Sequence, residues 1–462
     1  MPKYLVHFAQ LHADFRLPEL DSLAVLENVK LTYEKSAYSD EHPFLVVECE
    51  SDDEARKLIR RSILTKQIIR LVATAPTYDE VLEVAKRSTD LIDECRGKSF
   101  KFELDAFGRT FDQETQIARI EPFCFLPCGD VNLKNPEITL AYIEDYGHSE
   151  TAAARNPERA FFGVLVGRGD RGTVTKYDLK KRQYLGTTSM DAELSLVMAN
   201  QALVRAGSFV LDPFVGTGSF LVTCAHYGCF TMGTDIDGRQ IRGKGERSIR
   251  SNVEQYKLGG RVLDTVVADI AHHPWRATQL WDAIVCDVGF VTVPAATLRS
   301  LPTNFFLVRQ PPYGVRAGAK KLGFNANAKP PPGVDGPLPA LKKNGELRYP
   351  STIPYEMHDV IVDLIDFAAV HLVPGGRLVY WLPTIVDEYS PDDLPLHPQF
   401  KLVSNSAQVF GKWCRRLVTM EKLHDAGSLE TGECQNAALA EAASANPAHA
   451  KFREVYFGDG RT

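Results

Sequence analysis

Short hydrophobic segments that end on an aspartate recur through the second half of the sequence. Residues 209–211, 229–234, 265–268 and 281–286 are mostly apolar or β-branched, and helical lengths of chain separate most of them. Such alternation predicts βαβ units and a mainly parallel sheet, in which the carboxyl ends of the strands meet at one edge. We therefore expect an α/β domain over residues 190–424, with a ligand-binding crevice at that edge.

The first of these segments leads into a tight turn, Asp212-Pro-Phe-Val-Gly-Thr-Gly-Ser219, which precedes a predicted helix. Gly216 and Gly218 remove side chains where a ligand must approach the backbone. Asp212 would repel the diphosphate of a dinucleotide. S-adenosylmethionine has no phosphate and carries a cationic amino-acid end, which a carboxylate can accept directly or through water. The turn therefore predicts an S-adenosylmethionine site.

The acids that end the next two strands extend this site. Asp235 lies 19 residues beyond Gly216, an offset that suits a carboxylate on ribose hydroxyls. Asp269 could hold the adenine amino group, and Asp237 is a weaker candidate. Solvated caps on an ordinary Rossmann-like core are the alternative interpretation. The predicted cofactor site consists of Asp212, Pro213, Phe214, Gly216, Gly218, Asp235, Ile236, Asp269 and Ile270.

The fourth strand ends at Asp287, and a proline pair with an aromatic residue follows later, at Pro311, Pro312 and Tyr313. Methyltransferases that modify exocyclic amines carry an uninterrupted motif at this place, in which Asp, Asn or Ser is followed by two prolines and then Tyr or Phe. A carboxylate and a backbone carbonyl accept both N–H bonds of the amine and stabilise its developing charge. The prolines fix the backbone, and the ring stacks on an extruded base. These four residues are the predicted catalytic set.

A segment of 23 residues, 288–310, separates the two halves of this motif. Our hypothesis is that it is a translated, unspliced intron. Its 23 codons keep the reading frame, every valine codon begins with GT, and Gln310 can be encoded by CAG. A genuine loop insertion is the alternative. Sequencing the transcript tests the hypothesis, because an mRNA that retains all 69 nucleotides would contradict it.

The N-terminal part alternates short strands and helices in a different pattern. Residues 1–85 predict an α+β unit of a ferredoxin-like kind, and residues 86–166 predict a second unit. The polar and basic stretch 167–189 is interpreted as a linker, with Ser189 as the expected cap of the helix that follows.

Composition limits what we expect of the surface charge, of membrane spans and of the cysteines. The net charge of −6 argues against a wholly cationic surface, and no apolar run approaches the roughly 18 residues that span a bilayer. Nine scattered cysteines without a C-x-x-C pair, in a chain with no signal peptide, indicate reduced thiols rather than disulfides or metal ligands. We expect a cytoplasmic protein without a membrane span or bound metal. Residues 317–349 predict a flexible loop, and 425–462 a disordered tail.

Several motifs together resemble one family. They are Tyr4-Leu-Val-His-Phe-Ala-Gln10, the THUMP-like Val131-Asn-Leu-Lys-Asn-Pro-Glu137, Arg182 to Asp191, Asp212 to Ser219, Gly233 to Asp237, and Pro311 to Lys321. The chain resembles catalytic subunits of eukaryotic tRNA guanine-N2-methyltransferases that act at position ten of tRNA. The resemblance covers roughly residues 1–424 apart from the insert.

This resemblance implies a THUMP RNA-binding domain over 86–166, a Rossmann-like methyltransferase domain over 190–424, and methylation of guanine N2 in tRNA. It also implies a small zinc-binding activator subunit as a partner. A DNA or protein-glutamine N-methyltransferase uses a similar acceptor motif and is an alternative, which the N-terminal RNA-binding domain disfavours. A catalytically impaired RNA-binding subunit is the other alternative, and only the split motif supports it.

Basic and amide side chains in three places are candidate RNA contacts. By resemblance alone the first set lies in the THUMP-like loop, the second lies in the linker, and the third follows the second strand of the parallel sheet. Such side chains suit phosphate contacts, which position RNA without reading its sequence. A solvated basic face is the alternative. The candidates are Asn132, Lys134, Asn135, Lys180, Lys181, Arg182, Arg239 and Arg242.

Overall fold

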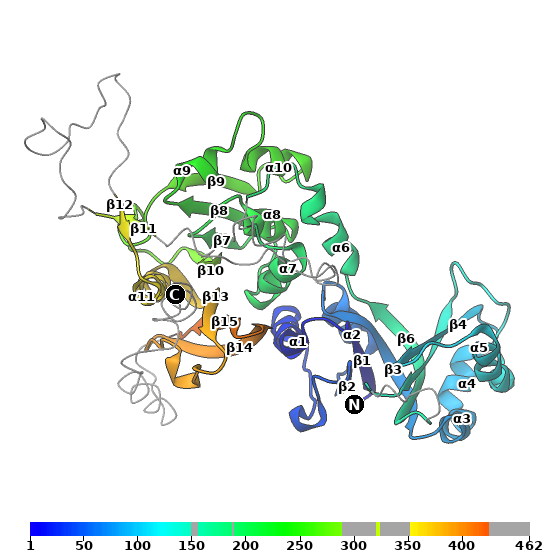
Figure 1. The fold of residues 1–462 in the computed structure, drawn as a ribbon. Coiled ribbons are helices and arrows are strands. Elements are labelled where there is room, and N and C mark those ends of the chain that lie inside the picture. The colour runs from blue at the N-terminus through cyan, green and yellow to red at the C-terminus, as the bar shows by residue number, and fades with distance from the viewer. Residues whose placement is uncertain (149–155, 187–188, 289–319, 324–351, 425–462) are drawn as a thin grey trace, which may run out of the picture. The chain divides into compact units, whose positions relative to one another are not determined.

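The computed structural model describes residues 1–148, 156–186, 189–288, 320–323 and 352–424. It divides into two compact units, Met1–Val174 and Thr175–Thr462 (Figure 1). The predicted insert beyond Val288, most of the predicted loop 317–349 and the whole predicted tail lie outside the described residues.

The first unit is built on one six-stranded sheet with the order β2-β1-β3-β6-β5-β4. Its strands are β1 (Lys3–Phe8), β2 (Phe44–Glu48), β3 (Thr65–Ala75), β4 (Phe100–Phe107), β5 (Ile138–Asp145) and β6 (Arg159–Arg168). Its helices are α1 (Ala13–Glu27), α2 (Asp52–Ile59), α3 (Tyr78–Lys86), α4 (Thr89–Cys95) and α5 (Gln113–Ile120). The sequence predicts a boundary between two N-terminal units at residue 85. Because β3 from the first predicted unit pairs with β6 from the second, both units share one sheet.

A side-chain cap marks the start of α2 in this unit, but not the start of α1. Ser51 accepts a hydrogen bond from the Glu54 amide and caps α2, as the sequence predicts. The sequence analysis missed α1, which begins after His12 in a left-handed conformation without a side-chain cap and contains Pro18. Tertiary contacts hold this helix instead. The buried carboxylate of Glu19 accepts hydrogen bonds from the amides of Ile63 and Leu64 at the entry to β3.

The second unit is built on a seven-stranded sheet with the order β14-β15-β13-β10-β7-β8-β9. Its strands are β7 (Phe209–Asp212), β8 (Phe230–Asp235), β9 (Val262–Val267), β10 (Trp281–Asp287), β13 (Leu372–Ile385), β14 (Phe400–Phe410) and β15 (Trp413–Lys422). Its helices are α7 (Ala192–Gln201), α8 (Ser219–His226), α9 (Gly238–Arg242), α10 (Ile249–Gln255) and α11 (Met357–His371). The strands from β13 to β9 are parallel, while β15 runs antiparallel to both of its neighbours, β13 and β14.

Three local expectations are corrected in and around this unit. The predicted linker contains helix α6 (Arg171–Lys176) and a 3-10 turn at Leu179–Lys181. The cap of α7 is Asp191, which accepts from the Leu194 amide, because Ser189 is buried and its Oγ lies 2.7 Å from Thr217 Oγ1. Within the predicted flexible loop, β11 (Lys320–Leu322) pairs with β12 (Thr352–Pro354), because backbone pairing compensates for a polar sequence.

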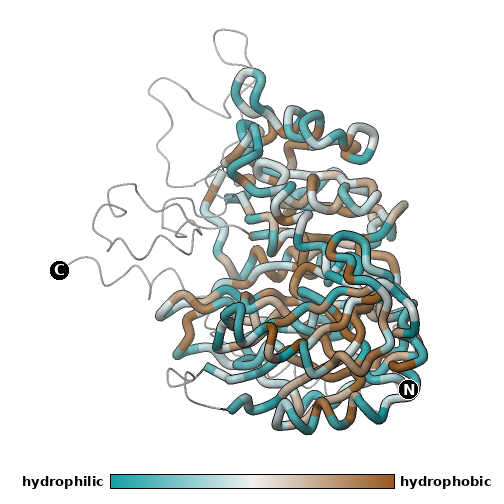
Figure 2. Tube along the Cα trace, turned by 90° about the vertical axis from the view of Figure 1, so that its right-hand side faces the viewer, coloured by the Kyte–Doolittle hydropathy of each residue, from teal (hydrophilic) through white to brown (hydrophobic). Residues whose placement is uncertain are grey.

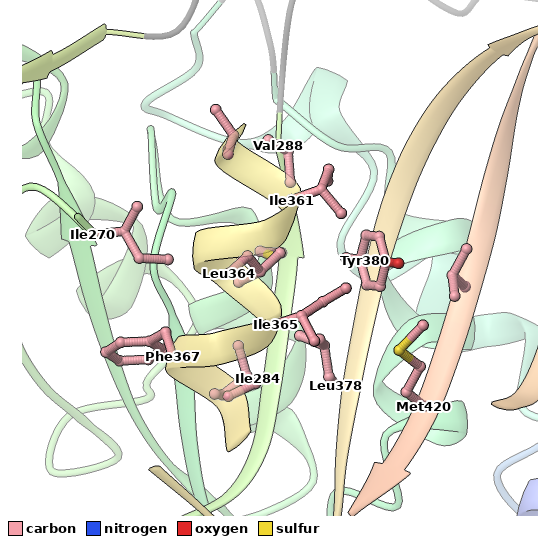
Figure 3. Packing of buried hydrophobic residues seen from close by; sticks show 14 of the residues in the cluster. Ile270, Ile284, Val288, Ile361, Leu364, Ile365, Phe367, Leu378, Tyr380 and Met420 are labelled. Atoms are coloured by element: carbon pink, nitrogen blue, oxygen red, sulfur yellow. The ribbon is translucent and has the colours of Figure 1, made fainter. Parts of the chain in front are cut away.

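The core of the second unit lies between α11 and one face of the sheet. Figure 3 shows Ile361, Leu364 and Ile365 of α11 packed against Ile284 of β10 and Leu378 of β13. The helix presents its apolar stripe at helical spacing, and each fully buried aliphatic side chain contributes about 1.5–3 kcal/mol. This packing fixes α11 against β10, whose end carries Asp287, and against its neighbour β13.

Hydrophobic and hydrophilic residues alternate along the chain in both units. Figure 2 shows hydrophobic and hydrophilic stretches alternating along the tube, as expected for elements with one face toward a core. Among the described helices none has the length and hydropathy that a membrane span requires.

We predict that Ile365→Ala lowers the free energy of unfolding of the second unit by about 2–5 kcal/mol, because it leaves a cavity in this core. Ile365 is 3% exposed. Val370 lies on the same helix and is 45% exposed, so Val370→Ala should change the free energy by less than about 0.5 kcal/mol. Denaturant unfolding of both variants measures the difference. Equal effects would contradict the packing described here.

Candidate cofactor and acceptor site

Four aspartates gather at the carboxyl edge of the parallel sheet. The strand order β10-β7-β8-β9 places Asp287, Asp212 and Asp235 at the ends of neighbouring strands, and Asp269 follows two residues after β9 (Figure 1). The chain order of the strands reverses at β7, which lies between β10 and β8. In open α/β sheets the crevice for a ligand forms at such a switch point.

Asp212 is the most buried of the four, at 2% exposure. Burial raises the pKa of its carboxyl well above the usual range, the Phe214 amide opposes this, and the charges of Asp235 and Asp287 raise the pKa further. Its Oδ1 accepts a hydrogen bond from the Phe214 amide at 3.0 Å. A buried carboxylate with spare acceptor capacity is stabilised by a bound cation. Asp212 therefore suits the ammonium group of an amino-acid ligand.

The glycine loop leaves space next to this carboxylate. Gly216 has φ +47°, and a Cβ built there would meet nothing closer than the Phe214 carbonyl oxygen at 4.0 Å. Gly218 has φ +80° and would bring its Cβ to 3.1 Å from Ile249. Left-handed backbone at both positions favours glycine. The open face at Gly216 is a cradle that a side chain would fill, so these residues fit S-adenosylmethionine.

Asp235 holds the loop as well as facing the crevice. Its two carboxylate oxygens accept hydrogen bonds from the Gly216 amide at 2.9 Å and from the Asp237 amide at 2.7 Å. Burial raises the pKa of Asp235, and these two amides oppose the rise. Asp237 is engaged elsewhere, because it caps α9 and forms an ion pair with Arg239 at 2.8 Å. Asp235 is thus the better placed of the two for ribose hydroxyls.

The other predicted cofactor residues line or support the crevice. Thr234 donates a hydrogen bond to the Pro213 carbonyl oxygen at 3.2 Å, which ties β8 to the loop. Phe214 and Ile236 are half-buried. Ile270 is 7% exposed and belongs to the core cluster shown in Figure 3, so it supports the site through packing.

Asp269 has protein partners on both oxygens. Its Oδ1 accepts from the Ala271 amide at 3.1 Å, and its Oδ2 accepts from the Leu322 amide of β11 at 2.8 Å. The His272 ring nitrogen lies 3.1 Å from the same Oδ2. Asp269 therefore ties the β11 strand to the end of β9, and its contact with adenine stays a prediction.

Asp287 ends β10 opposite Trp381 of β13. Burial raises the pKa of its carboxyl to about 6, and the positive charge of Arg415 opposes the rise. The carboxylate is therefore ionised at neutral pH and can accept hydrogen bonds. Pro311, Pro312 and Tyr313 lie outside the described residues. Sequence reasoning missed Arg415, because it lies on an antiparallel strand far along the chain from Asp287.

The candidate RNA contacts divide into side chains that reach solvent and side chains that do not. Arg182 is only 5% exposed and donates a hydrogen bond to Ser219 Oγ at 2.8 Å, so the prediction that it contacts RNA is wrong. Its guanidinium supports the start of α8. Lys180 is exposed, and the exposed Lys181 donates to the Thr175 carbonyl oxygen at 2.6 Å.

The remaining candidate RNA contacts lie in the loop at residues 132–135 and on α9. Asn132 shapes its own loop, because its Oδ1 accepts from the amides of Lys134 and Asn135. This leaves the exposed Lys134 as the charged side chain of that loop. Arg239 is paired with Asp237, whereas Arg242 is exposed near the end of α9.

The sequence matches two families and many curated relatives. The Tmrp11 THUMP N-terminal domain family matches residues 2–171, and the RMKL-like methyltransferase domain family matches residues 180–325. A tRNA (guanine(10)-N(2))-methyltransferase of Schizosaccharomyces pombe is 36% identical over 99% of this chain and 96% of that relative. The chain belongs to the tRNA (guanine(10)-N2)-methyltransferase family. The Homo sapiens relative TRMT11 is 34% identical over 98% of this chain and 95% of its own.

Family membership confirms the resemblance stated from the motifs. The chain is a tRNA methyltransferase that uses S-adenosylmethionine, with a Rossmann-like domain preceded by a THUMP region. The roles of individual site residues remain predictions, and the geometry above is what supports them.

Gly233 of β8 also belongs to the site, although the motif that contains it did not predict a role for it. A Cβ at this position of β8 would lie 2.4 Å from Val215 Cγ2 and 2.7 Å from Val215 Cβ. Val215 is the central residue of the cofactor loop, and its amide donates to the Thr234 carbonyl oxygen at 2.8 Å. The absence of a side chain at Gly233 therefore lets the loop pack closely on β8.

We predict that Gly233→Ala weakens binding of S-adenosylmethionine by tenfold or more, because relieving this overlap costs about 1–3 kcal/mol and displaces the loop. Gly259→Ala is the matched control, since a Cβ there meets nothing within 4 Å. Isothermal titration calorimetry of both variants measures the dissociation constants. Unchanged affinity in Gly233→Ala would show that the loop position is not set by this contact.

Proposed function

We propose that the chain methylates the exocyclic N2 amine of guanosine at position ten of tRNA, with Asp287 as the acceptor of the amine's N–H. The observation that carries this proposal is the position of Asp287 at the end of β10, next to Asp212 on β7 and the open glycine loop. A methyl donor seated on that loop would lie beside the carboxylate that orients the amine.

The chemistry needs an acceptor more than a strong base. The N2 lone pair of guanine is delocalised into the ring, so the amine is a weak nucleophile. When bound, S-adenosylmethionine supplies a methyl group on a sulfonium, so the N2–CH3 bond forms while the S–CH3 bond breaks. The ionised carboxylate of Asp287 accepts an N–H and stabilises the positive charge on N2 until its proton leaves to solvent.

Pro311, Pro312 and Tyr313 complete the acceptor site in this proposal. A proline carbonyl accepts the second N–H, and the tyrosine ring stacks on the extruded guanine. This arrangement requires that Asp287 and Pro311 be adjacent. We therefore propose that residues 288–310 are absent from the fully active protein, because acceptor positions must hold to about 0.5 Å.

We also propose how the chain contacts tRNA, which partner it has and where it is located. The THUMP region binds the tRNA, with Lys134 as the leading candidate contact because it is exposed on a loop shaped by Asn132. A small zinc-binding activator subunit, implied by the family resemblance, is the proposed partner. The proposed location is the cytoplasm.

The decisive substrate test replaces one nucleotide. Inosine differs from guanosine only by the missing N2 amine, so a transcript with inosine at position ten should accept no methyl group. The chain without residues 288–310, co-purified with its partner, should methylate the guanosine transcript, and the full chain should do so at least tenfold more slowly. Equal transfer to both transcripts would contradict the proposed acceptor atom.

In the same assay we predict that Asp287→Asn lowers kcat by about a hundredfold or more, since it removes the charge that stabilises the transition state. Binding of S-adenosylmethionine should stay within about threefold of wild type, because the carboxylates that accept the loop amides are those of Asp212 and Asp235. Asp387→Asn is the control, because Asp387 is an exposed aspartate of the same unit. Full activity of Asp287→Asn would assign the acceptor role to another residue.

A further inference from the structure

Arg415 places a positive charge in the interior of the second unit. The residue lies on β15 and is 3% exposed. Its guanidinium carbon lies 4.2 Å from the centroid of the Trp381 ring, and its Nε donates to Gln408 Oε1 at 2.6 Å. Stacking on an indole and a hydrogen bond from the neighbouring strand fix the orientation of the guanidinium.

The strand register places this charge beside the acceptor carboxylate. Trp381 of β13 is the register partner of Asp287 on one side, and Arg415 pairs with Pro383, two residues further along β13. Trp381 points to the α7 face of the sheet, where its Nε1 donates to Met198 Sδ. The Arg415 guanidinium covers the Trp381 ring, so it lies on the same face and at the same edge as Asp287.

A buried guanidinium needs a counter-charge, because removing it from water without one is costly. Burial lowers the pKa of Arg415, and the charges of Asp287 and Asp191 raise it. Both carboxylates act as counter-charges to Arg415. Asp191 caps α7, whereas Asp287 ends β10, so Asp287 is the one that Arg415 compensates at the reactive edge.

Among the described residues, two other titratable groups interact electrostatically with Asp287, and neither is a cation. Burial raises the pKa of Asp212 on β7 and of the Cys286 thiol on β10, and the charge of Asp287 raises the pKa of each further. Asp212 adds like charge, and a buried thiol stays neutral. Within the part of the chain that the structure describes, the compensation for Asp287 comes from Arg415.

We propose that Arg415 is a positioning residue for methyl transfer, whose buried guanidinium keeps Asp287 ionised and oriented toward the acceptor amine. This rests on the proposed role of Asp287 as the amine acceptor. Removal of the cation raises the pKa of Asp287 above its value of about 6. The carboxylate is then protonated over a wider range, and the loss of activity is largest at low pH and shrinks as pH rises.

The test is the pH profile of kcat for Arg415→Met, which removes the charge and keeps an unbranched side chain. Wild type should show an acid limb with its midpoint near about 6. In Arg415→Met the midpoint should move up by at least about one pH unit, which is a tenfold loss on the acid side that narrows above about pH 8. Arg415→Lys keeps the charge and should hold the midpoint close to wild type.

Arg377→Met is the matched control. Arg377 is also a 3% exposed arginine on this sheet, but it is paired with Glu421 at 2.9 Å and lies opposite Ala283, four residues before Asp287 on β10. Its loss should lower stability without moving the acid limb. If Arg415→Met lowers kcat by the same factor at every pH, Arg415 has a merely structural role and the proposal is wrong.

A second readout separates this proposal from the proposed function. Infrared titration of the chain alone, without tRNA or cofactor, follows the carboxylic-acid C=O band that Asp287→Asn removes. That band should titrate at higher pH in Arg415→Met, whether or not the wild type methylates position ten. If Arg415→Met does not fold, Gln408→Leu removes the partner of Nε and should shift the band in the same direction by a smaller amount. An unshifted band in the folded variant overturns the proposal.

Discussion

The parallel pairing of β10, β7 and β8 is the constraint on which the site depends. It brings the carboxylates that end these strands to one edge, where Asp287, Asp212 and Asp235 are neighbours. Like charges so close would repel one another. Each is compensated differently, Asp212 and Asp235 by backbone amides of the loop and Asp287 by the charge of Arg415. The chemistry of the edge follows from this division.

The same arrangement separates the residues proposed to bind the methyl donor from the residue proposed to bind the acceptor amine. On the β7 and β8 side, the carboxylates of Asp212 and Asp235 accept hydrogen bonds from amides of the glycine loop, and in the proposed function they face the methyl donor. On the β10 side, Asp287 lies opposite Trp381 of the parallel strand β13, and the guanidinium of Arg415 from the antiparallel strand β15 stacks on that ring. In the proposed function, the methyl donor and the acceptor amine therefore meet where β7 and β10 pair. The antiparallel β15 contributes to catalysis in this account as well as to packing.

Much of this arrangement could be predicted from the sequence, because strand ends carry local signals. Short apolar segments followed by an acid gave the positions of Asp212, Asp235 and Asp287, and strand order then placed them together. Contacts that are distant in sequence could not be predicted. Arg182 has the same charge as its exposed neighbours, yet packing of the chain on α8 buries it. Arg415 becomes visible only through the pairing of β13 with β15.

The most direct test of the central claim is a crystal structure of the chain with bound S-adenosylhomocysteine. The account predicts that the amino-acid end of the ligand lies over Gly216 with its ammonium group within hydrogen-bond reach of Asp212, directly or through one water. The ribose should lie against Asp235, and the sulfur should face Asp287. A ligand bound away from the carboxyl ends of β7 and β8, or with its sulfur turned from Asp287, would contradict the account.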